Sequence, residues 1–137
     1  MGTASDLHAS AAGKPAHASS VTILLRLEGL TVALLTAALY ARTGASWWLF
    51  TALWIAPDLS MLGYLASPCR GARIYNAFHT YLLPGILAFV ALLARIQGLL
   101  LPIALIWANH IGIDRALGYG LKYAEGFAFT HLGRIRR

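Results

Sequence analysis

Long apolar runs separated by short connections dominate the pattern of hydrophobic and polar positions along this chain. Three runs reach the length of about 20 residues that an α-helix needs to cross a hydrocarbon core of about 30 Å. They cover residues 22–41, 47–66 and 74–94. The connections lie at residues 42–46, 67–73 and 95–98. Short connections make neighbouring helices antiparallel, so the pattern predicts an up-and-down bundle.

A fourth run begins at Leu99 and is less regular than the others. Its purely apolar part ends near Trp107, so a helix that spans must continue through His110 and Asp114 to about Leu121. With this helix included, the predicted fold class is all-α, an integral membrane bundle of four transmembrane helices.

Two polar segments flank the predicted transmembrane domain, which covers residues 21–122. Residues 1–20 lack the apolar stretch of a signal peptide and hold too few hydrophobic residues to fold, which predicts a disordered N-terminal tail. Residues 123–137 mix aromatic and basic side chains, which predicts a C-terminal tail that lies on the membrane surface.

The composition indicates that lipid, not water, surrounds the bundle. The 137 residues are 58% hydrophobic and only 12% charged, whereas a soluble domain carries about 25% charged residues. Too little charge remains to cover a solvated surface. The lipid bilayer is therefore the expected partner of the outer surface.

The net charge of +6 comes mostly from Lys and Arg near the ends of the apolar runs. One side of the predicted bundle collects Lys14, Arg70, Arg73, Lys122, Arg134, Arg136 and Arg137. The other side collects Arg42 and Arg95. Because basic flanks stay in the cytoplasm, we expect a multi-pass protein of the inner cell membrane with both termini cytoplasmic. No basic face with interleaved aromatics stands apart from the membrane edges, so nucleic acid is not an expected partner.

Each predicted helix carries polar residues well inside its apolar run. In chain order they are Arg26 and Glu28, then Asp58, then Asn76 and His79, then Asn109, His110, Asp114 and Arg115. A charged residue near the bilayer centre costs about 2.5–3.5 kcal/mol, so these side chains should turn inward. Helices one and three start on the side where helices two and four end, which places all the sets at a similar depth in the cytoplasmic half. This common depth is the strongest functional signal in the sequence.

The functional hypothesis is a polar cavity with His79, His110, Asp58 and Asp114 at its base. Neutral imidazole and carboxylate suit a divalent transition metal as cofactor, and the same groups suit acid–base catalysis because free histidine titrates near physiological pH. His110 and Asp114 are four residues apart and share a helix face. The four would be the catalytic residues and metal ligands of a hydrolase-like enzyme that acts on an amphiphile. The side chains proposed to bind its substrate are Arg26, Glu28, Asn76, Arg115, Tyr119 and Lys122.

Two other interpretations use the same residues. In the first, they form a purely structural salt-bridge network in an accessory membrane subunit, with Arg26 paired to Asp58 or Asp114 and Glu28 paired to Arg115 or Arg73. In the second, the protein is a small ion or proton transporter, which would require a homo-oligomer because four helices are few for a complete path. No HExxH or paired-cysteine motif decides between them.

Two backbone features modify the predicted helices. Pro57 and Pro84 lie inside apolar runs, where each removes a backbone donor and tends to kink its helix. Small residues recur at four-residue spacing in the fourth helix, at Ala108, Gly112, Ala116 and Gly120. Such a stripe lets another backbone come close, so it predicts helix packing.

Several of these positions fall in recognisable runs. They are Leu-Arg-Leu-Glu-Gly (25–29), Ala-Pro-Asp-Leu-Ser-Met-Leu-Gly-Tyr (56–64), Tyr-Asn-Ala-Phe-His-Thr-Tyr (75–81), His-Ile-Gly-Ile-Asp-Arg-Ala-Leu-Gly-Tyr-Gly-Leu-Lys (110–122) and Thr-His-Leu-Gly-Arg (130–134). Together they resemble the bacterial membrane family called domain of unknown function DUF4260, over about residues 21–134. The resemblance implies a small multi-helix membrane protein and supplies no activity.

Overall fold

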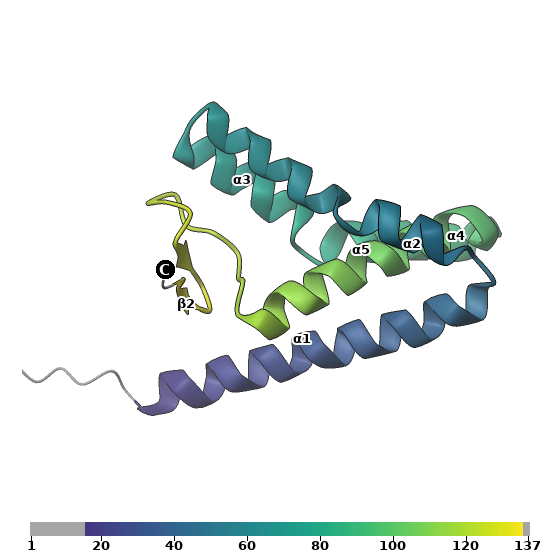
Figure 1. Ribbon diagram of the computed structural model, residues 1–137, viewed down its shortest axis with the longest axis horizontal. Helices are drawn as coiled ribbons and strands as arrows, with labels where there is room; N and C mark the ends of the chain where they lie inside the picture. Colours follow the sequence, from purple (N-terminus) through teal and green to yellow (C-terminus); the bar gives the residue numbers. More distant parts are fainter. Residues whose placement is uncertain (1–15, 136–137) are drawn as a thin grey trace, which may run out of the picture.

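The computed structural model describes residues 16–135, which form a helical bundle with a short C-terminal hairpin (Figure 1). The helices are α1 (Ala16–Thr43), α2 (Trp47–Trp54), the 3-10 helix η1 (Ala56–Leu65), α3 (Pro68–Phe78), α4 (Leu82–Leu93) and α5 (Gln97–Leu117). The strands β1 (Phe129–Thr130) and β2 (Gly133–Arg134) pair antiparallel. Most of the predicted N-terminal tail, residues 1–15, lies outside the described residues, and α1 already includes residues 16–20.

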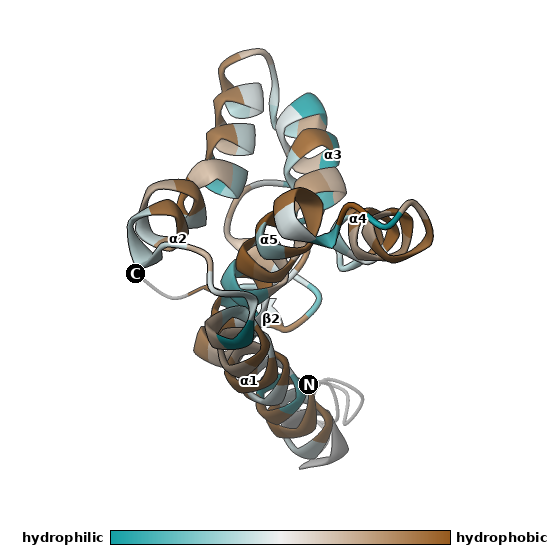
Figure 2. Cartoon of the chain, turned by 90° about the vertical axis from the view of Figure 1, so that its right-hand side faces the viewer, coloured by the Kyte–Doolittle hydropathy of each residue, from teal (hydrophilic) through white to brown (hydrophobic). Residues whose placement is uncertain are grey.

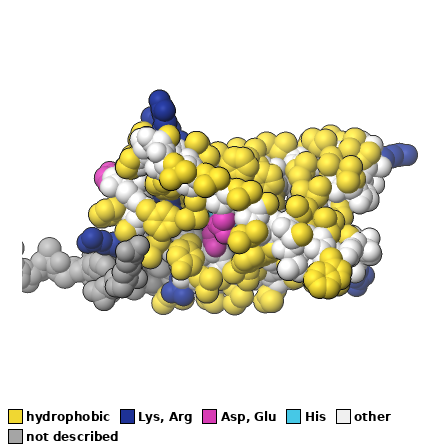
Figure 3. Space-filling view, turned by 45° about the horizontal axis from the view of Figure 1, so that its top comes forward, with side chains coloured by type: hydrophobic (Ala, Val, Ile, Leu, Met, Phe, Trp, Pro, Cys, Tyr) yellow, Lys and Arg dark blue, Asp and Glu magenta, His cyan; other side chains and the backbone are white. Residues whose placement is uncertain are grey.

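The predicted all-α membrane bundle is confirmed. Among the described residues, three helical segments are long and apolar enough to cross a membrane: Ser20–Thr43, Trp47–Leu65 and Pro68–Leu93. The fourth, α5, has 21 residues and holds the polar positions that make it less apolar. Figure 3 shows a face covered largely by hydrophobic side chains, with Lys and Arg gathered toward the two ends. An exterior of this kind fits a lipid bilayer.

The helix α5 forms the centre of the bundle, and Figure 2 shows the other helices arranged around it. Its closest neighbour is α1, because glycines face each other across the contact. A Cβ added at Gly112 would lie 2.8 Å from the Gly29 carbonyl oxygen and 2.9 Å from the Ala33 nitrogen. The part of the predicted stripe around Gly112 therefore packs a second backbone closely. Gly120, its last member, lies beyond the end of α5 and faces His131.

A buried asparagine fixes three helices at the middle of this packing. The side-chain amide of Asn109 donates to the Ala33 carbonyl at 2.7 Å, and its oxygen accepts from Trp54 Nε1 at 3.0 Å. Asn109 thus joins α5 to α1 and α2, and its polar atoms are used for structure.

Both middle spans break near their prolines. The second changes from α-helix to 3-10 helix at Ile55, just before Pro57, and the third is interrupted at residues 79–81, just before Pro84. Proline supplies no backbone donor, and its ring crowds the carbonyl of the residue four positions earlier. The predicted kinks are therefore full breaks, and each leaves a polar residue on non-α-helical backbone inside the bundle.

Two predicted boundaries are wrong. Residues 67–73 are not a connection, because α3 begins at Pro68, where the Ser67 hydroxyl accepts from the Arg70 amide at 3.2 Å and caps the helix. The fourth helix does not reach Leu121. It ends at Leu117, since Gly118 adopts a left-handed conformation with φ of 96° and terminates the helix.

The chain after α5 folds back beside α3 and the end of α5 (Figure 1). Asn76 of α3 holds it through two bonds to the backbone of Lys122, accepting from its amide at 2.7 Å and donating to its carbonyl at 2.8 Å. His131 Nδ1 accepts from the Leu121 amide at 2.8 Å. The placement of this tail on the membrane surface stays a prediction.

Candidate metal centre

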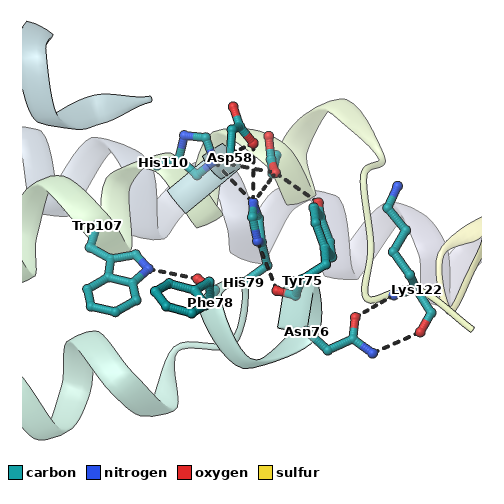
Figure 4. Close-up of polar contacts among 9 residues, drawn as sticks. Asp58, Tyr75, Asn76, Phe78, His79, Trp107, His110 and Lys122 are labelled. Carbon is teal, nitrogen blue, oxygen red and sulfur yellow. Dashed lines mark hydrogen bonds and ion pairs between the residues drawn. The ribbon is translucent and has the colours of Figure 1, made fainter. Parts of the chain in front are cut away.

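Four polar side chains meet where the two broken spans cross α5 (Figure 4). Asp58 lies in the first turn of η1, directly after the break in the second span. His79 ends α3 at the break in the third span. His110 and Asp114 lie one turn apart on α5, which is continuous here. The breaks in the flanking spans and the single face of α5 therefore bring the four together.

The distances between their polar atoms are those of ligands around one ion. Nε2 of His79 and Nε2 of His110 are 3.3 Å apart. Asp58 Oδ1 is 3.4 Å from each of these nitrogens, and Asp114 Oδ2 is 3.6 Å from one and 3.7 Å from the other. All four atoms lie within 4.8 Å of one another. A tetrahedral ion with bonds of about 2.0–2.1 Å keeps its ligand atoms about 3.3–3.4 Å apart, so the two imidazole nitrogens and one carboxylate oxygen have a spacing that fits such an ion.

The two imidazoles are the buried part of this cluster. The side chains of His79 and His110 are 3% and 1% exposed, whereas those of Asp114 and Asp58 are 17% and 36% exposed. Asp58 is thus the member that a molecule from outside reaches most easily.

A hydrogen bond from the second ring nitrogen of His79 sets the tautomer of this imidazole. Its Nδ1–H donates to the Tyr75 carbonyl at 3.0 Å, which leaves the lone pair of Nε2 directed at the cluster. The Tyr75 ring stacks on this imidazole at 3.7 Å, and its hydroxyl donates to Asp114 Oδ2 at 3.3 Å. The Nδ1 of His110 is buried and has no hydrogen-bond partner within residues 20–135. The Trp54 ring packs edge-to-face against the His110 ring, with the two centroids 4.8 Å apart.

The predicted ion pairs to the two carboxylates do not form. Arg26 Nε instead donates to the Ala116 carbonyl at 2.8 Å. This bond gives a partner to a carbonyl at the C-terminal end of α5, where the helix supplies none. Arg115 lies over the Tyr81 ring at 4.9 Å. Glu28 is exposed and makes no ion pair within the described part of the chain. Asp58 and Asp114 therefore remain available to the two histidines.

The family model described as domain of unknown function (DUF4260) matches residues 22–135. The chain belongs to this family. The matched region contains the whole cluster and the hairpin behind it, which confirms the resemblance found in the sequence. No curated protein and no solved structure matches the chain.

In this DUF4260 chain the last predicted substrate-binding residue, Lys122, reaches the site from the returning tail and not from the face of α5. Its side chain is buried among aromatic rings, with Nζ 3.8 Å from the centroid of Phe127 and 5.0 Å from that of Tyr75. Tyr119 lies farther away at 5.9 Å. Burial lowers the pKa of Lys122, and the charge of Asp114 partly offsets this effect. Tyr75 thus separates an ammonium group from the candidate metal centre.

Tyr75 and Trp54 are the parts of the DUF4260 site that the sequence did not reveal. In the sequence, both have the pattern of ordinary aromatic residues in a membrane helix. Tyr75 lies four residues before His79, so a shared helix face was the available signal. Trp54 carried no such signal, because its contact with His110 depends on how α2 packs against α5.

Proposed function

We propose that this protein is a membrane-embedded, metal-dependent hydrolase that acts on an amphiphilic substrate. The observation that carries the proposal is the convergence of two imidazole nitrogens and two carboxylate oxygens, in which each nitrogen lies 3.3–3.7 Å from the other three atoms. The cluster combines two carboxylates with two imidazoles and contains no lysine or arginine. A divalent cation would neutralise the carboxylates, and nitrogen and oxygen ligands of this kind suit zinc and related transition metals.

The differences in burial suggest separate roles for the four residues. His79, His110 and Asp114, the three least exposed, would hold the ion, as three protein ligands do in catalytic zinc sites. Such an ion supplies a water that ionises near neutral pH. Asp58 is the most exposed member and lies 3.4 Å from both imidazoles, so its carboxylate would accept the proton of the attacking water.

The surroundings of the cluster support an amphiphile as substrate. A cavity of about 200 Å³ lies beside it, lined by apolar side chains that include Pro57, Phe78, Ile106 and Trp107. Pro57 and Phe78 directly precede Asp58 and His79, and Figure 4 shows Trp107 donating to the backbone carbonyl of Phe78. On the other side of Tyr75 lies the Lys122 ammonium. An apolar tail would occupy the cavity while an anionic group approaches Lys122.

The transport hypothesis receives less support from the packing. Beyond the site, toward the predicted extracytoplasmic end, the core consists of Tyr40, Leu105 and Ile106. The Tyr40 hydroxyl is used locally, as a donor to the Ser46 carbonyl at 2.7 Å. An ion path would have to cross this apolar layer, which favours an enzyme that is open on one side.

An activity assay with Asp58→Asn tests the proposed hydrolase. The wild-type chain, loaded with Zn²⁺ or Mn²⁺ in lipid nanodiscs, should release a water-soluble product from bacterial lipid extract, detected by mass spectrometry. Asp58→Asn should retain bound metal through the other three ligands and lose at least about a hundredfold in rate, since a positioned base contributes about 10²–10⁴-fold. Product release at the wild-type rate by Asp58→Asn would remove Asp58 from the mechanism, and no product from the loaded wild type would reject the hydrolase.

The lowered pKa of Lys122 gives a prediction for pH dependence. Binding of inorganic phosphate to the metal-loaded protein, measured by calorimetry, should need the protonated amine and should weaken as the pH rises through the lowered pKa. The loss should therefore begin below the 10.5 of an ordinary lysine. Lys122→Met should bind weakly at every pH, and Lys122→Arg should bind without the alkaline loss because arginine stays charged. The same alkaline loss in Lys122→Arg would show that another group titrates.

The proposed orientation places the start of α3 in the cytoplasm and the start of α5 outside. The chain carries a natural probe, because Cys69 is exposed at the start of α3. Gly98→Cys in a Cys69→Ser background supplies the opposite probe, since a side chain there meets no atom within 4 Å. A membrane-impermeant maleimide should label residue 98 in intact cells and should label Cys69 only after permeabilisation. The reverse pattern would invert the topology.

A further inference from the structure

A second group of polar side chains lies apart from the candidate metal centre, in a groove between α1, the α3–α4 break and α5. The groove has a volume of about 450 Å³, and its polar lining comes from Glu28, Thr31, Tyr81 and Arg115. Leucines of α1, Leu24 and Leu27 among them, form its apolar edge and are exposed on the outer surface of the span. The groove therefore opens toward the surface that faces lipid.

Three of these polar groups lack the partners that a membrane environment demands. Within residues 20–135, neither Glu28 nor Arg115 forms an ion pair; Glu28 is exposed, and Arg115 lies over the face of the Tyr81 ring. The Tyr81 hydroxyl is buried and has no hydrogen-bond partner within residues 20–135. Glu28 lies inside the Ser20–Thr43 span, where an unpaired charge is unfavourable. A molecule that carries both a positive and a negative charge would supply partners for all three groups.

We propose that this groove binds the headgroup of a zwitterionic phospholipid. The phosphate would accept hydrogen bonds from the Arg115 guanidinium and the Tyr81 hydroxyl, and the ammonium would pair with Glu28. The adjacent leucines would contact the first methylenes of an acyl chain. An anionic lipid fits less well, because it offers no cationic group to Glu28 and adds negative charge beside it. The proposal does not rest on the hydrolase function, since no metal ligand belongs to the groove.

Native mass spectrometry of the full chain tests this site. The delipidated protein is titrated with phosphatidylethanolamine and phosphatidylglycerol that have identical acyl chains. We expect the wild type to prefer phosphatidylethanolamine, and Glu28→Gln to reduce that preference about tenfold by removing one charge-assisted bond. Tyr81→Phe and Arg115→Gln should weaken the binding of both lipids, because both carry a phosphate.

Matched controls separate this site from general lipid adhesion. Glu125→Gln and Tyr123→Phe change the same residue types at exposed positions in the tail and should leave both affinities unchanged. Equal affinity of the wild type for the two lipids would overturn the proposal, and so would a loss of preference in Glu125→Gln. A lipid-independent dimer that Glu28→Gln dissociates would show that a second copy occupies the groove instead. Coupled destabilisation by Glu28→Gln and Arg115→Gln without any effect of lipid would show that the two residues simply pair with each other.

Discussion

His110→Ala should bind a divalent metal at least about a hundredfold more weakly than the wild-type chain. Removal of groups that only orient a ligand costs about 10–100-fold in metal affinity, and His110 is proposed to be a ligand itself. Its Nε2 lies within 3.3–3.7 Å of the three other candidate ligand atoms. The remaining residues would leave one nitrogen and two carboxylates, of which Asp58 is partly exposed to competing water.

Elemental analysis after dialysis against trace Zn²⁺ measures this loss directly. The wild type should retain about one ion per chain, and His110→Ala should retain almost none. His8→Ala is the control, because it removes one of the chain's other histidines at a position far from the cluster in the sequence. His110→Gln provides a variant of closer size, in case the smaller alanine loosens the packing against Trp54.

Thermal unfolding in detergent gives a second measurement of the same binding. An ion that binds only the folded chain stabilises it by about 2.7 kcal/mol when present at a hundred times its Kd. Zn²⁺ should therefore raise the melting temperature of the wild type and of His8→Ala, a chelator should reverse the effect, and His110→Ala should respond to neither. If His110→Ala binds metal as well as His8→Ala, the four residues form a proton-sharing or structural cluster instead.

The sequence predicted the helical spans and the depth of the polar residues for one physical reason. Apolar run length and the alternation of helix direction place Asp58, His79 and His110 at the same level without knowledge of packing. Which residues then face each other depends on the breaks at Ile55 and at residues 79–81. The prolines predicted that the backbone would deviate there, but not how far.

The expected partners of the charged residues were wrong because backbone groups compete with side chains. Arg26 was expected to seek a carboxylate, but the nearer acceptor is the free Ala116 carbonyl at the end of α5. That end could not be located from hydropathy, since the rule that a span needs about 20 residues extended the helix beyond Gly118. The position of Lys122 likewise depends on the tail after α5, whose return no local pattern predicts.

Gly112→Ala should lower the free energy of unfolding by about 1–3 kcal/mol, although alanine is the better helix former. The added Cβ would lie 2.8 Å from the Gly29 carbonyl oxygen, 2.9 Å from the Ala33 nitrogen and 3.1 Å from the Ala33 Cβ. Two of these atoms are backbone, so no side chain can rotate away, and α1 and α5 must separate. The separation also weakens the Asn109 bond to the Ala33 carbonyl. Gly112→Leu should lose more, because its side chain needs still more space.

Gly85→Ala and Gly98→Ala are the matched controls, since an added Cβ at either position meets no atom within 4 Å. They should be neutral or slightly stabilising in the same unfolding measurement. The position of Gly112 between His110 and Asp114 adds a functional consequence. A shift of α5 away from α1 moves both residues relative to Asp58 and His79, so Gly112→Ala should also weaken Zn²⁺ binding, while the two controls keep it. A Gly112→Ala protein as stable as Gly85→Ala would contradict the close contact between α1 and α5. Full stability loss with unchanged Zn²⁺ affinity would instead show that His79 and Asp58 shift together with the two site residues of α5.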